Sequence, residues 1–195
     1  MGLDHLDIVL MHDAEEHVKE AIENAFPVLA EYRSQGLIKA IGIGINHAEQ
    51  ALQIMKGTDL DIALIAGRYS LLDQISHREL FPYALAHNID ISMGGVLNSG
   101  VLANPVAGAT YNYLPASDEI IARAAKIGEF LKARNIPLLA AALQFPLRHP
   151  AVTSVLTGPR TAAELLENVD AFNLELPADI WAELEDANLI ERIPA

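Results

Sequence analysis

Short apolar runs alternate along the chain with longer segments in which apolar residues recur at helical spacing. The apolar runs occupy residues 6–11, 39–45, 61–67, 89–96 and 151–158. Continuous apolar runs of this length are typical of strands buried on both faces of a parallel sheet. Strands that alternate with helices indicate βαβ units, so the pattern predicts an α/β fold around a parallel sheet.

The segments between the strands predict helices with recognisable ends. A helix is predicted over residues 15–35, and Gly36 can end it in a left-handed conformation, as Asn88 can for a later helix. Ser117 and Thr161 are suited to cap helices that run to about residues 134 and 172. Other helices are predicted to begin near 47, to end near 88, and to span 137–149 and 177–188. Residues 98–115, rich in Gly, Pro and aromatic side chains, are predicted to form a long loop.

Composition limits the class of protein. The 195 residues are enough for one domain with a full core, and no linker or low-complexity segment divides them. A net charge of −13 disfavours binding to nucleic acid or to anionic membranes, and no apolar run is long enough to span a bilayer. The absence of cysteine and of a signal-peptide pattern fits a cytoplasmic protein. We therefore expect one acidic, soluble domain over residues 1–195.

Five motifs, in this order, resemble the aldo-keto reductases: LDIVLMHD, GLIKAIGIG, RYSLLDQ, GGVLNSGVL and VTSVLTGPRTAAELLENV. The resemblance implies a (β/α)8 TIM-barrel oxidoreductase that uses NAD(P), of which this chain holds only the last five βα units. A closed barrel typically needs about 250 residues, so the short length agrees. GVLNSGVLANP and GATYNYLPA most resemble the branch with L-fucose dehydrogenase, D-threo-aldose 1-dehydrogenase and pyridoxal 4-dehydrogenase. We expect a small carbonyl compound or sugar as substrate, with hydride transfer to or from the nicotinamide.

His12 is the candidate catalytic residue. It follows an apolar strand directly, and in a barrel the carboxyl ends of the strands carry the active site. The family's catalytic set is Asp, Tyr, Lys and His, and the resemblance assigns only the histidine to this chain. His12 would then orient a substrate oxygen; without the resemblance it is a solvated residue at a strand end. Asp13 either holds the imidazole or begins the following loop.

The missing Asp, Tyr and Lys lead to two further expectations. The resemblance places these residues before the first strand of this chain, so we expect an N-terminally truncated protein whose isolated chain does not turn over. Open barrel edges would expose unpaired strands, which favours self-association of the isolated chain. The alternative function is a non-catalytic nucleotide-binding or interaction module derived from the barrel.

A glycine-rich turn follows the fourth strand. The resemblance assigns Gly95, Val96, Leu97, Asn98 and Ser99 to the pyrophosphate of the cofactor, because small residues let backbone N–H groups approach an anion. A glycine-rich turn by itself is a weak signal. Gly94 departs from the many relatives that place an aromatic side chain there to stack on nicotinamide.

The resemblance assigns the adenosine end of the cofactor to the segment after the fifth strand. The residues concerned are Gly158, Arg160, Glu164, Glu167 and Asn168. A carboxylate at Glu164 repels a 2′-phosphate and can accept a hydrogen bond from ribose, which favours NAD. Arg160 keeps NADP open. The alternative for Glu167 and Asn168 is an ordinary solvated helix face.

Four further positions carry open alternatives. Asn46 either contacts the carboxamide of nicotinamide or caps the helix that begins near His47. Arg68 either makes a polar contact to the cofactor, where relatives use a glutamine at the position of Ala66, or forms a structural ion pair. Tyr111 and Tyr113 either contact substrate or pack the long loop. The histidines show no ligand spacing, so no metal site is predicted.

Overall fold

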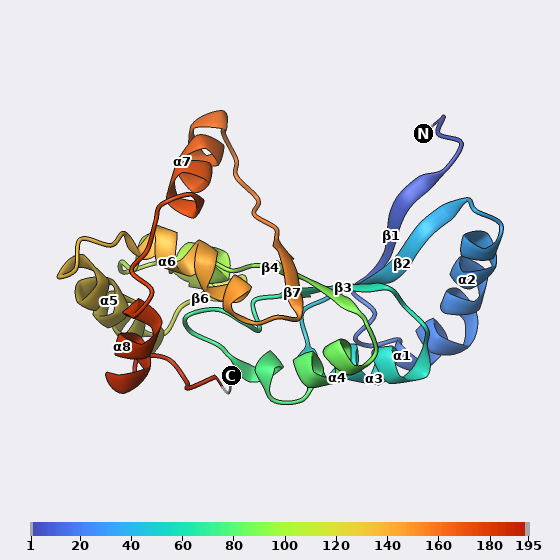
Figure 1. The fold of residues 1–195 in the computed structure, drawn as a ribbon, viewed down its shortest axis with the longest axis horizontal. Helices are drawn as coiled ribbons and strands as arrows, with labels where there is room; N and C mark the ends of the chain where they lie inside the picture. The colour runs from blue at the N-terminus through green and yellow to red at the C-terminus, as the bar shows by residue number, and fades with distance from the viewer. Residues whose placement is uncertain (1, 194–195) are drawn as a thin grey trace.

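The computed structural model describes residues 2–193, and a five-stranded parallel sheet forms its centre (Figure 1). The strands lie side by side in chain order, β1-β2-β3-β4-β7, which confirms the parallel sheet expected from the sequence. Their bounds are β1 Leu6–His12, β2 Ile38–Ile45, β3 Ile62–Ala66, β4 Asp90–Gly94 and β7 Val152–Val155. Since all five run in one direction, all their carboxyl ends lie at one edge of the sheet.

Helices connect the strands in the alternation that the sequence predicts. The α-helices are α1 Val18–Glu20, α2 Phe26–Ser34, α3 Ala48–Gly57, α4 Leu80–Ala86, α5 Asp118–Lys132, α6 Leu138–Gln144, α7 Ala162–Phe172 and α8 Ile180–Asp186. A π-helical turn, η1 (Ala21–Ala25), joins α1 to α2, and the 3₁₀ turns are η2 Ile75–His77, η3 Asn98–Gly100 and η4 Phe145–Arg148. The Ser117 and Thr161 hydroxyls accept the N–H groups of Ile120 and Glu164. Both predicted caps are therefore confirmed.

Proline accounts for two differences from the predicted helices. The segment predicted as one helix over 15–35 begins at Val18 and contains the π-turn just before Pro27, a residue without an N–H to donate. The helix predicted over 137–149 leaves α geometry at Gln144 and tightens to 3₁₀ around Pro146. In both places the missing donor interrupts the regular hydrogen-bond pattern.

The segment 98–115 is more ordered than the predicted loop. After η3 it folds into a small antiparallel hairpin, β5 (Thr110–Tyr111) with β6 (Leu114–Pro115). Asn112 and Tyr113 at its tip have left-handed backbone angles of 50° and 65° in φ. Thr110 donates its hydroxyl to the Ser99 carbonyl, and the Tyr113 N–H donates to the Ser99 hydroxyl, so Ser99 holds the hairpin.

The two faces of the sheet differ in burial. One face, here called the outer face, packs against α2, α3 and α4, and its side chains form the hydrophobic core. Its core residues, each at most 3% exposed, are Ile41, Ile43, Ile45, Ala63, Ile65, Ile91 and Met93. The opposite, inner face carries Ile8, Leu10, His12, Ala40, Gly42, Gly44, Ile62, Leu64 and Ser92. Ile8 is 52% exposed, so the inner face lacks an equivalent cover.

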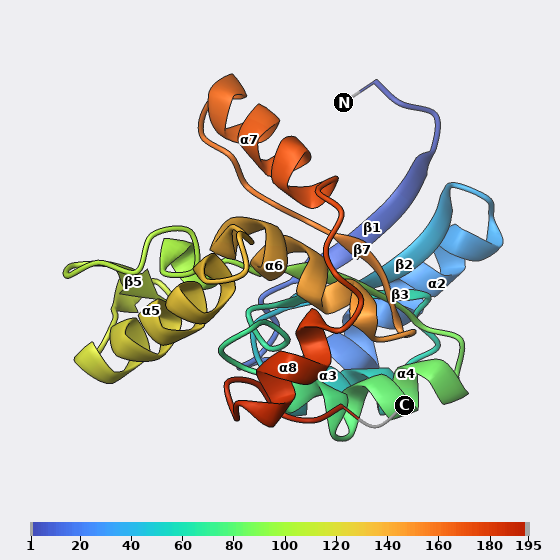
Figure 2. The same cartoon turned by 60° about the vertical axis from the view of Figure 1, so that its left-hand side comes forward.

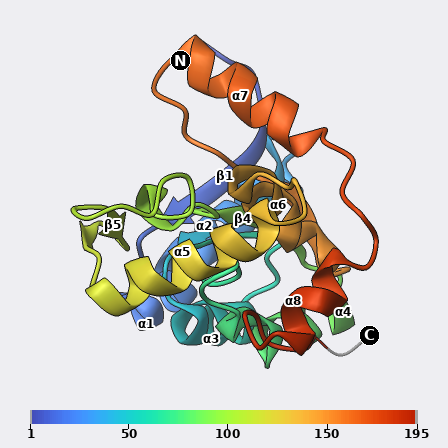
Figure 3. The ribbon, with the colours of Figure 1, turned by 90° about the vertical axis from the view of Figure 1, so that its left-hand side faces the viewer.

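Helix α7 contacts α6, where Gln144 Nε2 donates to the carbonyls of Ala171 and Leu174, but it lies away from the helices that cover the outer face. Figures 1, 2 and 3 all show it displaced from α3, α4 and α8, at the end of two extended connections. None of its residues is buried, and it exposes Leu165, Leu166, Val169 and Phe172. Within residues 2–193, no helix has the length and apolar character needed to cross a membrane.

Candidate functional site

A cleft of about 1090 Å³ opens at the carboxyl edge of the sheet. The segments that follow β2, β3, β4 and β7 line it, because the parallel sheet brings these strand ends together. Every residue predicted to contact the cofactor lines this one cleft. They are Asn46, Gly95, Val96, Leu97, Asn98, Ser99, Gly158, Arg160, Glu164, Glu167 and Asn168.

The turn after β4 contributes residues 95–100 to the lining of the cleft. Gly95, Asn98, Ser99 and Gly100 all have positive φ values, between 46° and 105°. A Cβ at Gly95 would lie 3.0 Å from the Gly67 nitrogen, so a side chain here would press on the neighbouring loop. The N–H groups of Val96 and Leu97 have no hydrogen-bond partner within residues 2–193. A concave turn with free N–H groups is suited to bind an anion.

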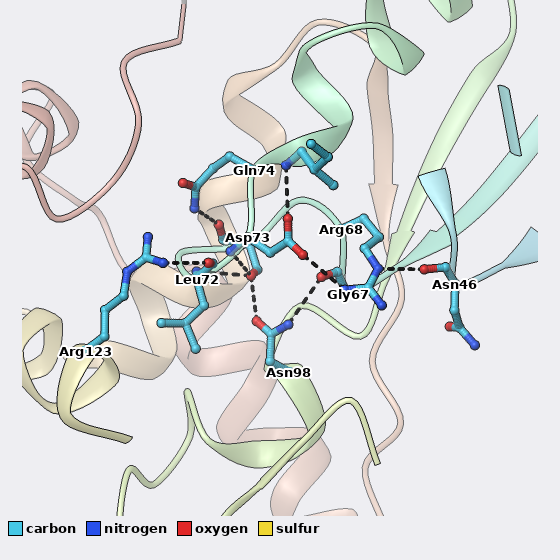
Figure 4. Close-up of polar contacts among 10 residues, drawn as sticks. Asn46, Gly67, Arg68, Leu72, Asp73, Gln74, Asn98 and Arg123 are labelled. Carbon is cyan, nitrogen blue, oxygen red and sulfur yellow. Dashed lines mark hydrogen bonds and ion pairs between the residues drawn. The ribbon is translucent and has the colours of Figure 1, made fainter. Parts of the chain in front are cut away.

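Asn98 anchors this turn from below. It is buried, its Oδ1 accepts the Ser70 hydroxyl at 2.5 Å, and its Nδ2 donates to the Gly67 carbonyl at 3.3 Å (Figure 4). Its amide is thus already bound to protein. Asn98 shapes the turn, and the backbone supplies the donors.

Loop 67–76, after β3, ties several elements together. Arg68 Nε donates to the Asn46 carbonyl at 2.6 Å, and its Nη1 lies 3.1 Å from an oxygen of Asp73 (Figure 4). The Ser70 hydroxyl accepts the N–H groups of Leu72 and Asp73. Through these contacts the ends of β2, β3 and β4 are fixed relative to one another.

At the adenosine end predicted from the sequence, Arg160 and Glu164 form an ion pair. Glu164 Oε1 accepts from Arg160 Nη2 at 2.9 Å, and its Oε2 accepts the Arg160 backbone N–H at 2.7 Å. Together with the Arg160 charge, these bonds hold the pKa of Glu164 below its usual value. The N–H of Glu164 donates to Thr161 and completes the start of α7. Each oxygen of this carboxylate therefore accepts one hydrogen bond from Arg160.

His12 lies at the carboxyl end of β1 and is not among the residues that line the cleft. A Cβ at Gly44 would lie 2.9 Å from His12 Cδ2, so the ring occupies space that only glycine leaves open. His12 Nδ1 lies 3.0 Å from an oxygen of Asp13, whose φ of 52° turns the chain away from the strand. Asp13 thus both contacts the ring and begins the loop, the two alternatives that the sequence left open.

The remaining candidates separate in the structure. Tyr113 lines the cleft and is 80% exposed, whereas Tyr111 does not line it. Burial, with the nearby Asp73 charge, raises the pKa of Tyr111. Asn46 lines the cleft but does not cap α3, since His47 is the N-cap residue and makes no side-chain cap; the predicted cap is wrong.

The sequence analysis did not identify the residues that shape the cleft or hold its loops in place. Gly44 and Gly67 have no side chain to signal a role, and Ser70 lies in an ordinary polar loop. Leu156 lines the cleft merely because it follows β7. The one signal was position, since most of the lining residues follow one of the strands of the sheet. Within residues 2–193, no three His, Asp or Glu side chains gather as metal ligands.

Comparisons with known proteins agree on one family. The model of the aldo/keto reductase family matches residues 1–189. D-threo-aldose 1-dehydrogenase from a Pseudomonas species is 38% identical over 193 residues, which cover 97% of this chain and 59% of that protein. Pyridoxal 4-dehydrogenase from Microbacterium luteolum is also 38% identical, over 203 residues, with the same coverage. The chain therefore spans 59% of the length of these relatives.

Solved structures agree with the fold. An aldo-keto reductase from Bacillus halodurans, in its holo form, superposes with a TM-score of 0.76 at 22% identity, over 96% of this chain and 62% of that one. An aldo/keto reductase from Klebsiella pneumoniae, in complex with NADP and acetate, gives a TM-score of 0.67 at 16% identity. It covers 98% of this chain and 62% of its own.

Proposed function

Because this chain belongs to the aldo/keto reductase family, we propose that it is the C-terminal part of an NAD(P)-dependent (β/α)8 oxidoreductase. Its substrate would be an aldose or an aldehyde-type compound, and hydride would pass between that substrate and nicotinamide. The observation that carries the proposal is the single cleft at the carboxyl edge, which gathers every residue predicted to contact the cofactor. The names of the two 38%-identical relatives support the substrate class.

The residues present fit a dinucleotide. The turn at 95–97 offers free backbone N–H groups for a pyrophosphate, which suits a chain whose net charge of −13 gives no general attraction for anions. The cleft continues from this turn towards Gly158 and Glu164 on one side and Asn46 on the other. The bound dinucleotide supplies the hydride chemistry, and the protein positions its two halves.

His12 is proposed to bind the oxygen of the substrate that gains or loses the proton. Its ring lies over Gly44 on the inner face of the sheet, and Gly44 comes two residues before Asn46, which lines the cleft. An imidazole can accept or donate one hydrogen bond near neutral pH. The resemblance assigns only this one of the four catalytic residues to the chain, so we expect dinucleotide binding without turnover by the chain alone.

The Arg160–Glu164 pair is proposed to favour NAD over NADP. The sequence assigned this preference to a carboxylate facing ribose, but both oxygens of Glu164 accept from Arg160. Glu164 therefore neutralises the cation that would otherwise attract a 2′-phosphate. In E164Q we expect NADP to bind about fivefold more tightly, while NAD changes little.

Calorimetric titration with NAD, NADP and ADP-ribose tests the proposed function. We expect NAD and ADP-ribose to bind and NADP to bind more weakly. E167Q is the matched control, since Glu167 lines the same cleft from the same helix. A wild-type chain that binds none of these ligands would contradict the proposal. An equal gain in NADP affinity in E164Q and E167Q would contradict the role of the Arg160 pair.

The second candidate is a nucleotide-binding module without catalysis. Its supporting observation is that the cleft forms within a chain to which only His12 of the catalytic set is assigned. An assay of aldose oxidation with NAD separates the two: turnover near 1 s⁻¹, ordinary for an enzyme, would contradict the module. Tight binding of ADP-ribose without turnover would favour the nucleotide-binding module, provided that turnover is also absent when the N-terminal part of a relative's barrel is fused to this chain.

A further inference from the structure

The order of the strands fixes the order of groups along the cleft. In the sheet β1-β2-β3-β4-β7, Glu164 follows β7, turn 95–99 follows β4, Arg68 follows β3, Asn46 follows β2, and His12 ends β1. A dinucleotide with its adenosine over Glu164 and its pyrophosphate on the turn would place its nicotinamide towards Arg68 and Asn46. The reacting end would then lie on the side of the sheet where β1 ends in His12.

Arg68 is held so that its charge faces the cleft. Its Nε donates to the Asn46 carbonyl at 2.6 Å, and its Nη1 lies 3.1 Å from Asp73 Oδ2 (Figure 4). The side chain is 21% exposed and lines the cleft, and its Nη2 has no partner within residues 2–193. Two bound nitrogens fix the plane of the guanidinium, because its donors form a rigid fork.

The counter-ion lies behind the arginine. Asp73 does not line the cleft, and its Oδ1 accepts the Ile75 N–H at 3.0 Å. The cation is therefore nearer to a ligand in the cleft than the carboxylate is. Asp73 weakens the field of Arg68 at the ligand without cancelling it.

The nicotinamide ring carries a positive charge when oxidised and none when reduced. A fixed cation beside it repels the oxidised form and leaves the reduced form unaffected. We propose that Arg68 is a specificity-determining residue that favours the reduced dinucleotide in the cleft. The site is then set to accept hydride from a hydroxyl-bearing substrate, such as an alcohol or a sugar hemiacetal.

This inference rests on the proposed function and adds the direction of hydride flow. Oxidation of such a substrate breaks one C–H and one O–H bond. The hydride reduces the oxidised dinucleotide, and the proton passes to solvent. A cation that disfavours the oxidised ring makes this transfer more favourable on the protein.

The test compares three ligands and four forms of the chain. Dissociation constants for NAD, NADH and ADP-ribose are measured by calorimetry with wild type, R68M, D73N and the double variant R68M/D73N. R68M keeps most of the aliphatic stem but removes the cation and leaves Asp73 unpaired. We expect it to raise the ratio Kd(NADH)/Kd(NAD) about fivefold. D73N keeps the Oδ1 acceptor for Ile75 and leaves Arg68 without its counter-ion, so we expect the ratio to fall.

The controls separate charge from shape. ADP-ribose shares the pyrophosphate but lacks the nicotinamide, so we expect its Kd to change in parallel with that of NADH in all four forms, whereas the Kd of NAD departs from both. We expect the double variant to lie between the two single variants. Since D73N preserves the loop contact, it tests the inference even where R68M fails to fold.

The outcomes distinguish the inference from the proposed function. A wild-type chain that binds none of the three ligands overturns both. If ADP-ribose binds but the NADH-to-NAD ratio stays the same in R68M and D73N, Arg68 is a structural tie and the inference alone is overturned. Shifts of the same sign in R68M and D73N overturn it as well.

Discussion

The outer and inner faces of the sheet are built from the same strands and have opposite characters. On β2, Ile41 and Ile43 point to the outer face and are fully buried, whereas the alternate positions Gly42 and Gly44 point inward. On β4, Met93 belongs to the core, and Ser92 on the other face accepts the Ser154 hydroxyl at 2.9 Å. Successive strand residues alternate between faces, so one strand serves two purposes.

The difference shows where stability and chemistry reside. The outer face holds large β-branched and long apolar side chains against α2, α3 and α4. The inner face is small or polar near the carboxyl edge, where His12 and the cleft lie. The cleft is lined mostly by residues outside the hydrophobic core. We expect substitutions on the two faces to affect different measurements.

The largest expected effect comes from matched isoleucine truncations. Ile43→Ala removes a fully buried side chain from the outer face and should lower the free energy of unfolding by about 3–4 kcal/mol. Ile8→Ala removes a side chain that is 52% exposed on the inner face, and should cost less than about 1.5 kcal/mol. Urea denaturation measures both. Equal losses would contradict the contrast between the faces.

A second pair compares two glycines of the inner face. A Cβ at Gly42 would lie 1.9 Å from the Ile62 carbonyl oxygen, so Gly42→Ala forces backbone to move and should cost about 1–3 kcal/mol. A Cβ at Gly44 meets the exposed His12 ring, which can swing away at little cost. We expect Gly44→Ala to leave stability nearly unchanged.

The NMR resonances of the His12 ring provide the second measurement for Gly44→Ala. The ¹H and ¹⁵N resonances of the His12 imidazole should shift, because the ring loses its place over β2, while they stay unchanged in a surface control such as Glu49→Ala. Unmoved His12 resonances would show that Gly44 does not position the ring.

The sequence predicted the outer face better than the inner one. Apolar runs such as 39–45 predict strands buried on both faces, which holds on the outer face but not at Ile8 on the inner face, which is 52% exposed. The cofactor positions came from motifs, and the parallel sheet brings them to one edge. The ion pair between Arg160 and Glu164 and the tie from Arg68 to Asn46 depend on rotamers and loop geometry, which no pattern encodes. Gly44 carries no chemical group, so only its neighbour His12 reveals its role.

The interior of the molecule also contains a buried titratable group, His149. His149 is 8% exposed, lies 4.6 Å from the Phe81 ring, and accepts the Ala151 N–H on Nδ1. Burial, then repulsion from His77, lowers its pKa below the usual 6.5. As pH falls through 6.5, the unfolded chain takes up a proton that the folded chain refuses, so stability decreases until the pH reaches the lower folded pKa.

Unfolding in urea between about pH 8 and pH 5.5 checks this sign. Wild type should lose stability across the window, and His149→Asn, whose amide oxygen replaces the Nδ1 acceptor, should lose less. His17→Asn, at an exposed histidine, is the control and should follow wild type. A His149→Asn curve parallel to wild type would contradict the contribution of this buried ring.

The smallest expected effect on stability, with the clearest effect on association, concerns α7. Its apolar residues Leu165, Leu166 and Val169 are between 45% and 63% exposed, and the β1 edge and the inner face are open as well. Contiguous exposed apolar surface and unpaired strand edges favour contact with other chains. We expect the wild-type chain to self-associate as its concentration rises.

Leu166→Lys tests whether that association uses the open side of the molecule. It should change the free energy of unfolding by less than about 0.5 kcal/mol, because Leu166 is 63% exposed. It should also lower the mass measured by light scattering. Leu85→Lys makes the same change on α4, where Leu85 is 46% exposed among the helices that cover the outer face, and should leave the mass unchanged. If both variants dissociate equally, charge rather than the α7 surface controls association, and a wild type that stays monomeric at every concentration removes the reason to regard the inner side as open.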